Sequence, residues 1–299
     1  MNSSDGFVSA RGTRVPRLLY GTAWKKERTA GLVERALSLG FRGIDTACQP
    51  KHYAEQGVGA GVAACLRRGL ERQALYLQTK FTPVSGQDPR RIPYDPKAAL
   101  AEQVRQSCAV SLRQLETSYL DCLVLHSPLS SFAHTLEVWR AFEALVASGV
   151  VRELGISNCY EPSEFEALYR AAHVKPLVLQ NRFYAQTGYD RELRSFCRAH
   201  AVSYQSFWTL TANRGLLSQP PLDALARAYA VTPEQVLLRG LTQLGVCPLT
   251  GTSSEQHMRQ DLAIFDFALS EPELAQLEEA FSQAALSKAA GAQRSVREP

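Results

Sequence analysis

Short apolar runs alternate along this chain with longer segments whose hydrophobic positions recur every three to four residues. The short runs have the length of buried strands, and the longer segments have the spacing of amphipathic helices. Eight runs are predicted as strands: residues 18–20, 43–45, 75–79, 121–125, 154–157, 177–180, 202–206 and 246–248. Helices are predicted over residues 29–39, 56–70, 97–115, 135–147, 161–172, 189–200, 222–229, 233–244, 254–263 and 271–281.

Strand and helix alternate eight times at even spacing, without a linker or a change in composition. This alternation is typical of a parallel α/β fold, and eight units in about 250 residues favour a closed (β/α)8 TIM barrel over an open sheet. The alternating residues 6–17 predict a small N-terminal β-hairpin. We expect one domain over residues 1–299, with a core over about 18–281 and a flexible tail over 282–299 after the C-terminal helix.

Composition narrows the class of protein. The formal net charge is +4, but basic and acidic residues are mixed on the predicted helices, so we expect no nucleic-acid partner. The apolar runs are too short to span a bilayer, and the N-terminus lacks the order of a secretory signal. The seven cysteines contain no Cys-x-x-Cys pair. This usage predicts a reducing cytoplasm, no disulfide framework and no structural zinc.

Three predicted strands end in a polar or charged residue. Asp45 closes the second strand, Lys80 follows the third and His126 follows the fourth. Tyr53 lies in the loop after Asp45. A charge at the end of a buried strand costs free energy unless another group pairs with it. Because the carboxyl ends of strands in a parallel barrel converge, we expect these four side chains to form one catalytic site.

Two further motifs are interpreted as structural. Residues 57–62 read Gly-Val-Gly-Ala-Gly-Val, but a dinucleotide fingerprint needs glycine where Val62 stands and an apolar strand before it. Tyr76 and Lys80 have the spacing of the Tyr/Lys pair of a short-chain dehydrogenase, which requires a helix. In the predicted strand these two residues lie roughly 13 Å apart, so we expect Tyr76 to line the barrel one layer below Lys80.

The order of motifs resembles that of the aldo-keto reductase superfamily over roughly residues 18–281. The resemblance rests on Gly21-Thr22 with Trp24, Gly43-Ile44-Asp45-Thr46-Ala47, Tyr53, Thr79-Lys80, Leu125-His126-Ser127-Pro128, Gly155-Ile156-Ser157-Asn158, Gln180-Asn181 and Ile264-Phe265-Asp266-Phe267. Each motif is weak alone, and their order makes the resemblance specific. It implies a carbonyl reductase on a (β/α)8 barrel that binds NAD(P) across the carboxyl ends of the strands.

The resemblance places a catalytic tetrad on Asp45, Tyr53, Lys80 and His126. Reduction of a carbonyl by hydride leaves an alkoxide that must be protonated, and a tyrosine with an ordinary pKa of ~10 is a weak acid at neutral pH. We expect the ammonium of Lys80, held by Asp45, to lower the pKa of Tyr53. His126 is expected to donate a hydrogen bond to the carbonyl oxygen. Tyr53 is preferred over the neighbouring His52 because the residues after it follow the family pattern.

Later strand ends match family positions that bind the cofactor. Ser157, Asn158 and Gln180 correspond to groups that bind the nicotinamide carboxamide, although Ser157 and Asn158 also suit helix capping. Phe207 falls where the family stacks an aromatic ring, and a shift of one residue would transfer that role to Trp208. The other cofactor-binding residues implied are Gly21, Thr22, Asp45, Thr250, Gly251, Thr252, Ser253, His257, Gln260 and Asp261.

The region expected to hold the cofactor phosphate departs from the family pattern. Pro248-Leu249-Thr250 replaces the usual Pro-Lys-Ser, and His257 stands where the family has an arginine for the 2′-phosphate. Backbone amides at a helix N-terminus can still hold a phosphate, and Arg259 is a substitute cation. We expect NADPH as the cofactor, with NADH as an alternative and a smaller preference than in relatives with the cationic clamp.

The substrate side is expected to include Trp24, Tyr53, His126, Ser127 and Trp208. Many relatives with small pockets have a tryptophan directly after the catalytic histidine, so Ser127 predicts a wide pocket for bulky aldehydes or ketones. The alternative interpretation is that Ser127 only caps the following turn. The expected partner is a small-molecule carbonyl substrate, and we expect a monomer or a weak homo-oligomer.

Two other classes of function stay open at this point. The chain can be a cofactor-binding regulatory subunit of the same fold with little turnover, although an intact tetrad argues against this. It can also be a metal-dependent barrel lyase or isomerase. Such an enzyme needs a cluster of acids or histidines at strand ends, where only Asp45 and His126 stand, and no metal site is predicted.

Overall fold

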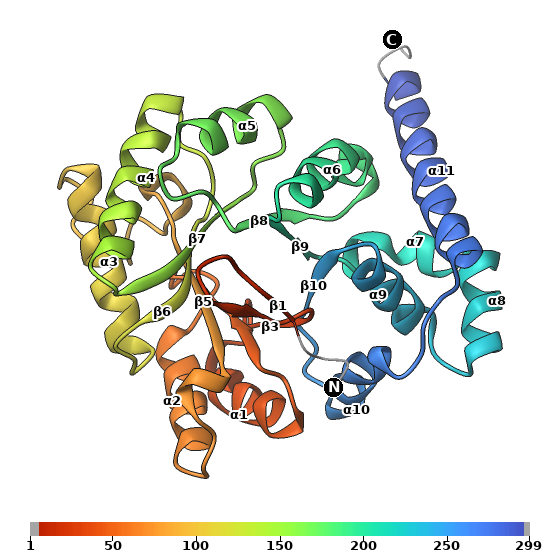
Figure 1. Cartoon of the computed structure of the whole chain (residues 1–299), viewed down its shortest axis with the longest axis horizontal. Helices are drawn as coiled ribbons and strands as arrows, with labels where there is room; N and C mark the ends of the chain where they lie inside the picture. The colour runs from red at the N-terminus through yellow and green to blue at the C-terminus, as the bar shows by residue number, and fades with distance from the viewer. Residues whose placement is uncertain (1–5, 296–299) are drawn as a thin grey trace.

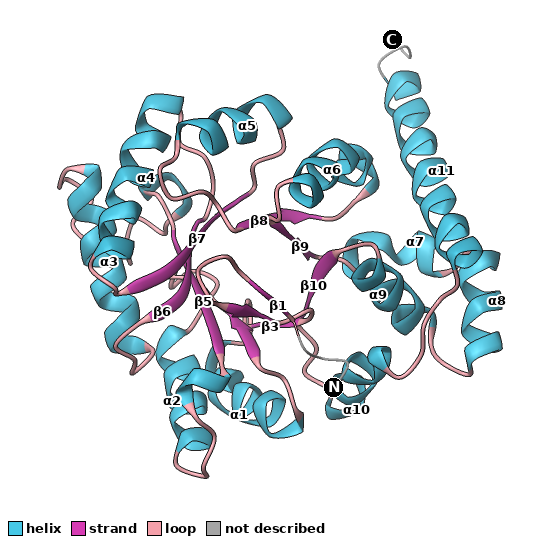
Figure 2. Cartoon of the chain, viewed as in Figure 1, coloured by secondary structure: helices cyan, strands magenta, loops and turns pink. Residues whose placement is uncertain are grey.

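The chain folds as a closed parallel barrel surrounded by helices, which confirms the predicted (β/α)8 fold class. The structure, a computed structural model, describes residues 6–295 (Figure 1). Neighbouring strands follow the order β10-β3-β4-β5-β6-β7-β8-β9, and Figure 2 shows them at the centre of the ring of helices. The strands are β3 (Leu19–Gly21), β4 (Gly43–Asp45), β5 (Tyr76–Phe81), β6 (Leu120–Leu125), β7 (Val151–Ser157), β8 (Val178–Arg182), β9 (Ser203–Phe207) and β10 (Val246–Thr250).

Several helices begin at residues that suit a helix N-terminus. Thr232 forms a capping box with Gln235 at the start of α9, and proline occupies the first turn of α5 and α8. The helices are α1 (Thr29–Leu39), α2 (Glu55–Leu66), α3 (Leu100–Gln114), α4 (Phe132–Ala147), α5 (Pro162–Ala171), α6 (Arg191–Ala199), α7 (Arg214–Leu217), α8 (Pro220–Tyr229), α9 (Pro233–Gln243), α10 (Glu255–Leu262) and α11 (Glu271–Ser295). Apolar faces of these helices pack on the outer faces of the strands and form the main core.

Helix ends account for most differences between prediction and structure. α2 ends at Leu66 rather than at residue 70, because the chain turns there and passes through Gly69 at φ +96°. This left-handed conformation suits glycine and does not continue a helix. α3 begins at Leu100 rather than at residue 97, because the Asp95 carboxylate accepts a hydrogen bond from the backbone N–H of Lys97 (2.9 Å) in a preceding turn.

The C-terminal helix is longer than the sequence pattern predicts. α11 runs to Ser295 instead of ending at Phe281, so residues 282–295 form helix where a tail was expected. This segment lacks an apolar stripe, but alanine, glutamine and lysine are strong helix formers. In Figure 1 the C-terminal part of the helix projects away from the barrel, whereas Phe281 nearer its start is buried in the core. Residues 296–299 of the expected tail lie outside the described residues.

The predicted N-terminal hairpin forms and covers the amino-terminal end of the barrel. β1 (Phe7–Val8) pairs in antiparallel with β2 (Arg14–Val15). The Ser9 hydroxyl donates to the Glu153 carboxylate near the start of β7 (2.5 Å). Val15 is fully buried in a cluster that includes Tyr76, which lies inside the barrel as predicted. The opposite, carboxyl end of the strands is therefore the open one.

A network of buried glutamines lies in the barrel interior. Gln78, Gln180 and Gln205 extend from β5, β8 and β9 and are at most 2% exposed. The amide nitrogens of Gln78 and Gln180 donate to the Gln205 amide oxygen (2.8 and 2.9 Å). The Tyr76 hydroxyl donates to the Gln78 amide oxygen (2.8 Å). Because buried amides need partners, these bonds fix the orientation of each side chain.

Candidate active site

A cavity of about 1070 Å³ opens at the carboxyl ends of the barrel strands. It is lined by residues from the ends of most strands and from the segments that follow them. The predicted site residues that line it are Gly21, Trp24, Asp45, Tyr53, His126, Ser127, Ser157, Asn158, Gln180, Phe207, Trp208, Thr250, Gly251, Thr252, His257, Gln260 and Asp261. An active site at this end is the general pattern for such barrels.

Three predicted site residues, Thr22, Lys80 and Ser253, do not line the cavity. Lys80 lies beneath the cavity surface and is 1% exposed. Thr22 is fully buried, and both its backbone N–H and its hydroxyl donate to the Asp45 carbonyl oxygen (3.0 and 2.9 Å). Ser253 follows the lining residue Thr252 without lining the cavity itself. Thr22 is therefore closed off from a ligand, whereas Ser253 is exposed beside the cavity.

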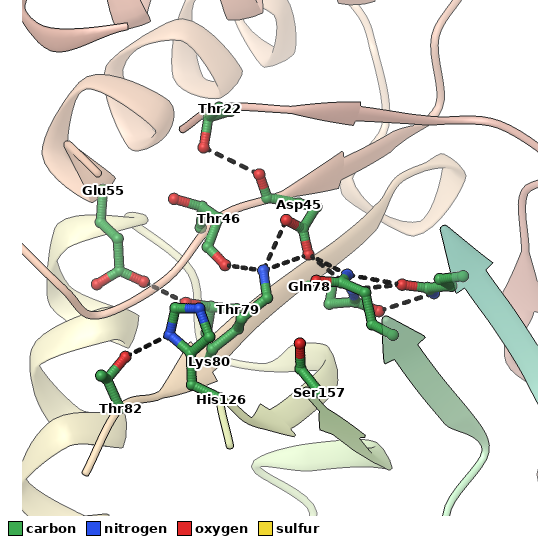
Figure 3. A network of polar contacts seen from close by, with 12 residues as sticks. Thr22, Asp45, Thr46, Glu55, Gln78, Thr79, Lys80, Thr82, His126 and Ser157 are labelled. Atoms are coloured by element: carbon green, nitrogen blue, oxygen red, sulfur yellow. Dashed lines mark hydrogen bonds and ion pairs between the residues drawn. The ribbon is translucent and has the colours of Figure 1, made fainter. Parts of the chain in front are cut away.

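Asp45 and Lys80 form a buried ion pair at the base of the cavity (Figure 3). The Lys80 ammonium donates to both carboxylate oxygens of Asp45 (2.7 and 2.6 Å) and to the Thr46 carbonyl oxygen (2.9 Å). Gln78 and Gln180 also donate to Asp45 Oδ1 (2.7 and 3.0 Å). A buried ion pair is retained only when its remaining hydrogen-bonding capacity is met. Strands β4, β5 and β8 supply these partners, so the barrel itself builds the pair.

Tyr53 lies above this pair and beside His126. Its ring centroid is 6.0 Å from that of His126 and 5.4 Å from the Lys80 ammonium nitrogen. Burial raises the pKa of Tyr53 well above its ordinary value, and the negative charge of Asp45 raises it further. The predicted lowering of this pKa is therefore wrong for the structure as it stands. The reason is that burial disfavours the charged phenolate, and the Asp45 carboxylate disfavours it further.

His126 follows β6 and is held by a residue that the sequence prediction missed. Its Nδ1 lies 2.6 Å from the Thr82 hydroxyl, just after β5. Burial lowers the pKa of His126 well below its ordinary value, and Lys80 and His52 lower it further. The imidazole is therefore neutral at physiological pH. Because Thr82 occupies Nδ1, Nε2 is the nitrogen left for a carbonyl oxygen.

His52, the alternative proton donor, occupies a different part of the cavity wall. Its ring lies against that of Trp24, with centroids 4.0 Å apart and planes tilted by 38°, and its Nδ1 lies 2.9 Å from the Gln49 amide oxygen. Burial lowers the pKa of His52, with Lys51 as a second cause. Tyr53, rather than His52, has the contacts with His126 and the Lys80 ammonium. The geometry thus favours the same residue that the sequence pattern favoured.

Glu55 is a buried carboxyl group directly behind the ion pair. It is 3% exposed and accepts hydrogen bonds from the Thr79 and Ser111 hydroxyls. Burial raises the pKa of Glu55 to about 7, although these hydroxyls and the charge of Lys80 oppose the shift. The sequence placed Glu55 in a family pattern but contained no local signal of this environment, because Ser111 comes from α3.

Replacement of Glu55 by glutamine is expected to remove a pH-dependent loss of stability. A folded-state pKa of about 7, above the ordinary 4.5, contributes stability below pH 4.5 that is lost as the pH rises through 7. As the pH rises from 5 to 8, the free energy of unfolding of the wild type should therefore fall by up to about 3 kcal/mol relative to that of Glu55→Gln. Urea unfolding at both pH values measures this shift. The exposed Glu27→Gln serves as control, and an equal shift in both variants would contradict the assignment.

The far end of the cavity is built by the segment after β10 and the start of α10. The Ser254 hydroxyl caps α10 by accepting from the His257 backbone N–H (3.3 Å), and Thr252 accepts from the Ser254 backbone N–H (3.1 Å). His257 lines the cavity, whereas Arg259 pairs with Glu255 (2.7 Å) and is not in the described lining. Arg259 is therefore poorly placed as the substitute cation. Lys25, missed in the sequence, lines the cavity and donates to the Gly251 carbonyl oxygen.

The donor set of the cavity fits a nicotinamide dinucleotide. One part offers the Asn158 amide, the Ser157 hydroxyl and the Gln180 amide oxygen, whose own nitrogen is bound to Asp45 and Gln205. These groups match the hydrogen-bonding needs of a carboxamide. Another part offers the hydroxyls and backbone of residues 250–254 at a helix N-terminus, which suits a phosphate. The Phe207 ring lies in the lining as an apolar surface for a flat ring.

Three lining residues hold a backbone conformation that is uncommon for them. Trp24, Asn158 and Trp208 have φ values of +64°, +54° and +57°. Left-handed backbone in residues other than glycine is uncommon, and strain of this kind gathers at functional sites. Trp24 and Trp208 are also 57% and 49% exposed, which leaves two large aromatic faces at the cavity for a ligand.

The described residues also bear on three further expectations. All seven cysteines are buried and free of disulfides. Among residues 6–295, no helix has the length and apolar character needed to cross a membrane. The same residues contain no group of three His, Cys, Asp or Glu side chains arranged to hold a metal ion.

Residues 17–281 match the family model described as Aldo/keto reductase family. The chain is 30% identical to the glyoxal reductase of Bacillus subtilis over 242 residues, which cover 81% of this chain and 79% of that protein. It is 26% identical to the methylglyoxal reductase DkgA of Salmonella typhimurium over 269 residues, which cover 89% of this chain and 90% of that protein.

Solved structures give the same result. The crystal structure of an aldo/keto reductase from Brucella melitensis is 28% identical, with a TM-score of 0.76, over 91% of this chain and 97% of that one. The aldo-keto reductase AKR2E5 of the silkworm, Bombyx mori, complexed with NADPH, is 25% identical, with a TM-score of 0.78, over 92% and 86%. With its eight-stranded barrel and the match over residues 17–281, this chain belongs to the aldo/keto reductase family of oxidoreductases.

Proposed function

We propose that this protein reduces aldehydes or ketones to alcohols with hydride from NADPH. The observation that carries the proposal is the convergence of Tyr53 and His126, at the cavity surface, over the buried Asp45–Lys80 pair. A bound nicotinamide cofactor would supply the hydride that reaches the carbonyl carbon. The relatives named as glyoxal and methylglyoxal reductases support a carbonyl substrate of small size.

The four residues have separable roles in this proposal. His126, neutral because of its lowered pKa, donates a hydrogen bond from Nε2 to the carbonyl oxygen and orients it. Tyr53, protonated because of its raised pKa, gives its proton to that oxygen as the carbonyl carbon is reduced. The ammonium of Lys80 then stabilises the resulting phenolate, and Asp45 holds the ammonium in place. The phenolate regains a proton from solvent before the next turnover.

A carbonyl screen tests the proposed function. NADPH and NADH are first titrated into the protein by fluorescence, and oxidation of each cofactor is then followed with aldehydes and ketones of increasing size. The expected result is binding of NADPH and turnover with several aldehydes. Tight cofactor binding without turnover on any carbonyl would favour the alternative of a regulatory subunit, and absence of cofactor binding would reject both.

Cofactor choice is expected to depend on His257. This residue is exposed at the cavity next to Thr252, where a 2′-phosphate would meet the start of α10. His257→Arg should raise the affinity for NADPH about tenfold and leave that for NADH nearly unchanged, because arginine binds phosphate through two parallel hydrogen bonds. Dissociation constants for both cofactors measure this. Equal gains for NADPH and NADH would place residue 257 away from the 2′-phosphate.

We further propose that the protein works in the cytoplasm as a monomer or weak homo-oligomer. Seven buried, free thiols support a reducing compartment. Size-exclusion chromatography with light scattering at two protein concentrations tests the oligomeric state.

A further inference from the structure

Arg182 brings a positive charge to the active-site cavity. It is the last residue of β8 and lines the cavity. Its guanidinium carbon lies 4.3 Å from the ring centroid of Trp208 and 5.3 Å from that of Tyr184. Stacking on aromatic rings is a favourable environment for a guanidinium, and it fixes the direction in which the N–H groups point. The side chain is therefore held in place before any ligand arrives.

The hydrogen-bonding capacity of this guanidinium is unused. Arg182 Nε is buried and has no hydrogen-bond partner. Within residues 6–295, its guanidinium forms neither a hydrogen bond nor an ion pair, whereas Arg72 and Arg152 both pair with Asp121. A guanidinium carries five N–H donors in a fork that matches an anion. An arginine in a cavity wall with all donors unmet is suited to a ligand that brings its own negative charge.

A chain of hydrogen bonds ties Arg182 to the reacting end of the cavity. The Arg182 backbone N–H donates to the Tyr160 hydroxyl (3.2 Å), which donates to Asn158 Oδ1 (3.2 Å). Asn158 in turn donates from its amide nitrogen to the His126 carbonyl oxygen (2.8 Å). Only two side chains therefore separate Arg182 from His126 along this chain. A ligand held at His126 by its carbonyl oxygen and at Arg182 by an anionic group would span one continuous cavity.

The carboxylate of Asp45 does not compete for Arg182. Asp45 is neutralised by Lys80 and further bound by Gln78 and Gln180. The hydroxyls and backbone amides that suit a cofactor phosphate lie in the segment after β10, at the start of α10. A carboxylate on the substrate matches the paired N–H donors of an arginine. Binding it at Arg182 leaves the segment after β10 free for the cofactor phosphate.

We propose that Arg182, supported by Trp208, binds a carboxylate of the carbonyl substrate. The preferred substrates are accordingly aldehydes or ketones that carry a carboxylate, and this inference rests on the proposed carbonyl reduction. An arginine paired with a carboxylate typically discriminates charged from neutral ligands by about 10- to 100-fold.

The test compares 4-carboxybenzaldehyde with its methyl ester, which differ in charge but present the same aldehyde. In the wild type, kcat/KM should be higher for the acid, mainly through a lower KM. Arg182→Gln should reduce the acid-to-ester ratio of kcat/KM by about 10- to 100-fold, and Arg182→Lys should lie between. Because each ratio is measured within one protein sample, a loss of stability cancels. Arg170→Gln, an exposed arginine paired with Glu166 on α5, is the matched control and should keep the wild-type ratio.

The second part of this test measures the dissociation constants of NADPH and NADH for Arg182→Gln. Unchanged cofactor affinity with a reduced ratio supports the inference. A fall in affinity for both cofactors with an unchanged ratio would assign Arg182 to a cofactor phosphate and overturn it, as would an unchanged ratio alone. If the wild type reduces the ester without preferring the acid, this inference fails while the proposed function stands. If the wild type binds cofactor but reduces neither aldehyde, the proposed function itself fails.

Discussion

Tyr53→Phe should reduce the rate of carbonyl reduction by about 10²- to 10⁴-fold while cofactor affinity stays close to that of the wild type. The substitution removes only the hydroxyl and keeps the ring that lies 6.0 Å from His126 and 5.4 Å from the Lys80 ammonium. No other described group combines a raised pKa with contacts to both of these residues. Stopped-flow oxidation of NADPH with several aldehydes, together with a cofactor titration, measures both quantities.

The pH dependence of the wild type adds a second readout for Tyr53. Its raised pKa means that the acid form persists below that pKa and is lost only as the pH rises through it. The rate of reduction should therefore show no fall up to about pH 9, since even an ordinary tyrosine titrates near ~10. His52→Ala is the control because His52 is the neighbouring alternative. A Tyr53→Phe enzyme that keeps most of its turnover, with His52→Ala inactive, would transfer the role to His52.

Lys80→Met should abolish most of the reduction at neutral pH and should also destabilise the protein. The change removes the charge that stabilises the phenolate left after proton transfer. It also leaves the Asp45 carboxylate buried without its cation, which typically costs about 3–5 kcal/mol. Asp45→Asn should be milder for the rate, because Lys80 keeps its charge. Single-turnover rates and thermal unfolding of both variants separate the catalytic loss from the structural one.

The relative losses of rate in Lys80→Met and Asp45→Asn distinguish the roles of the two residues of the ion pair. Asp45→Asn retains a side chain of nearly the same shape, so it is the matched partner of Lys80→Met in the comparison. If Asp45→Asn lost as much rate as Lys80→Met at temperatures where both remain folded, the ammonium would have no special part in proton transfer. The pair would then serve only to hold the base of the cavity together.

The architecture and the convergence of Asp45, Lys80 and His126 were accessible from sequence because local pattern determines both. The buried strands are short and rich in apolar residues, and Asp45, Lys80 and His126 stand at or just beyond the ends of three of them. A parallel barrel brings those ends together whatever the intervening helices contain. The position of Tyr53 beside the pair then required only the motif order of the family.

The features that the sequence could not supply all depend on contacts between distant segments. Thr82 binds His126 across 44 positions, and Glu55 is buried by Ser111 from another helix. The pKa of Tyr53 was predicted in the wrong direction because it depends on how deeply the folded chain buries this side chain and on how close Asp45 lies to it. Side-chain hydrogen bonds between distant segments cannot be predicted from the spacing of apolar and polar residues along the chain.

In the proposed mechanism, the glutamine network restricts the routes by which a proton can return to Tyr53. Gln78, Gln180 and Gln205 lie in the barrel beside the ion pair, together with a buried apolar cluster, and amides do not titrate near neutral pH. The hairpin covers the opposite end. Water must therefore reach the phenolate through the same cavity by which the substrate enters. A product or inhibitor that seals this opening would keep Tyr53 without its proton until it leaves, so recovery of the acid is coupled to product release.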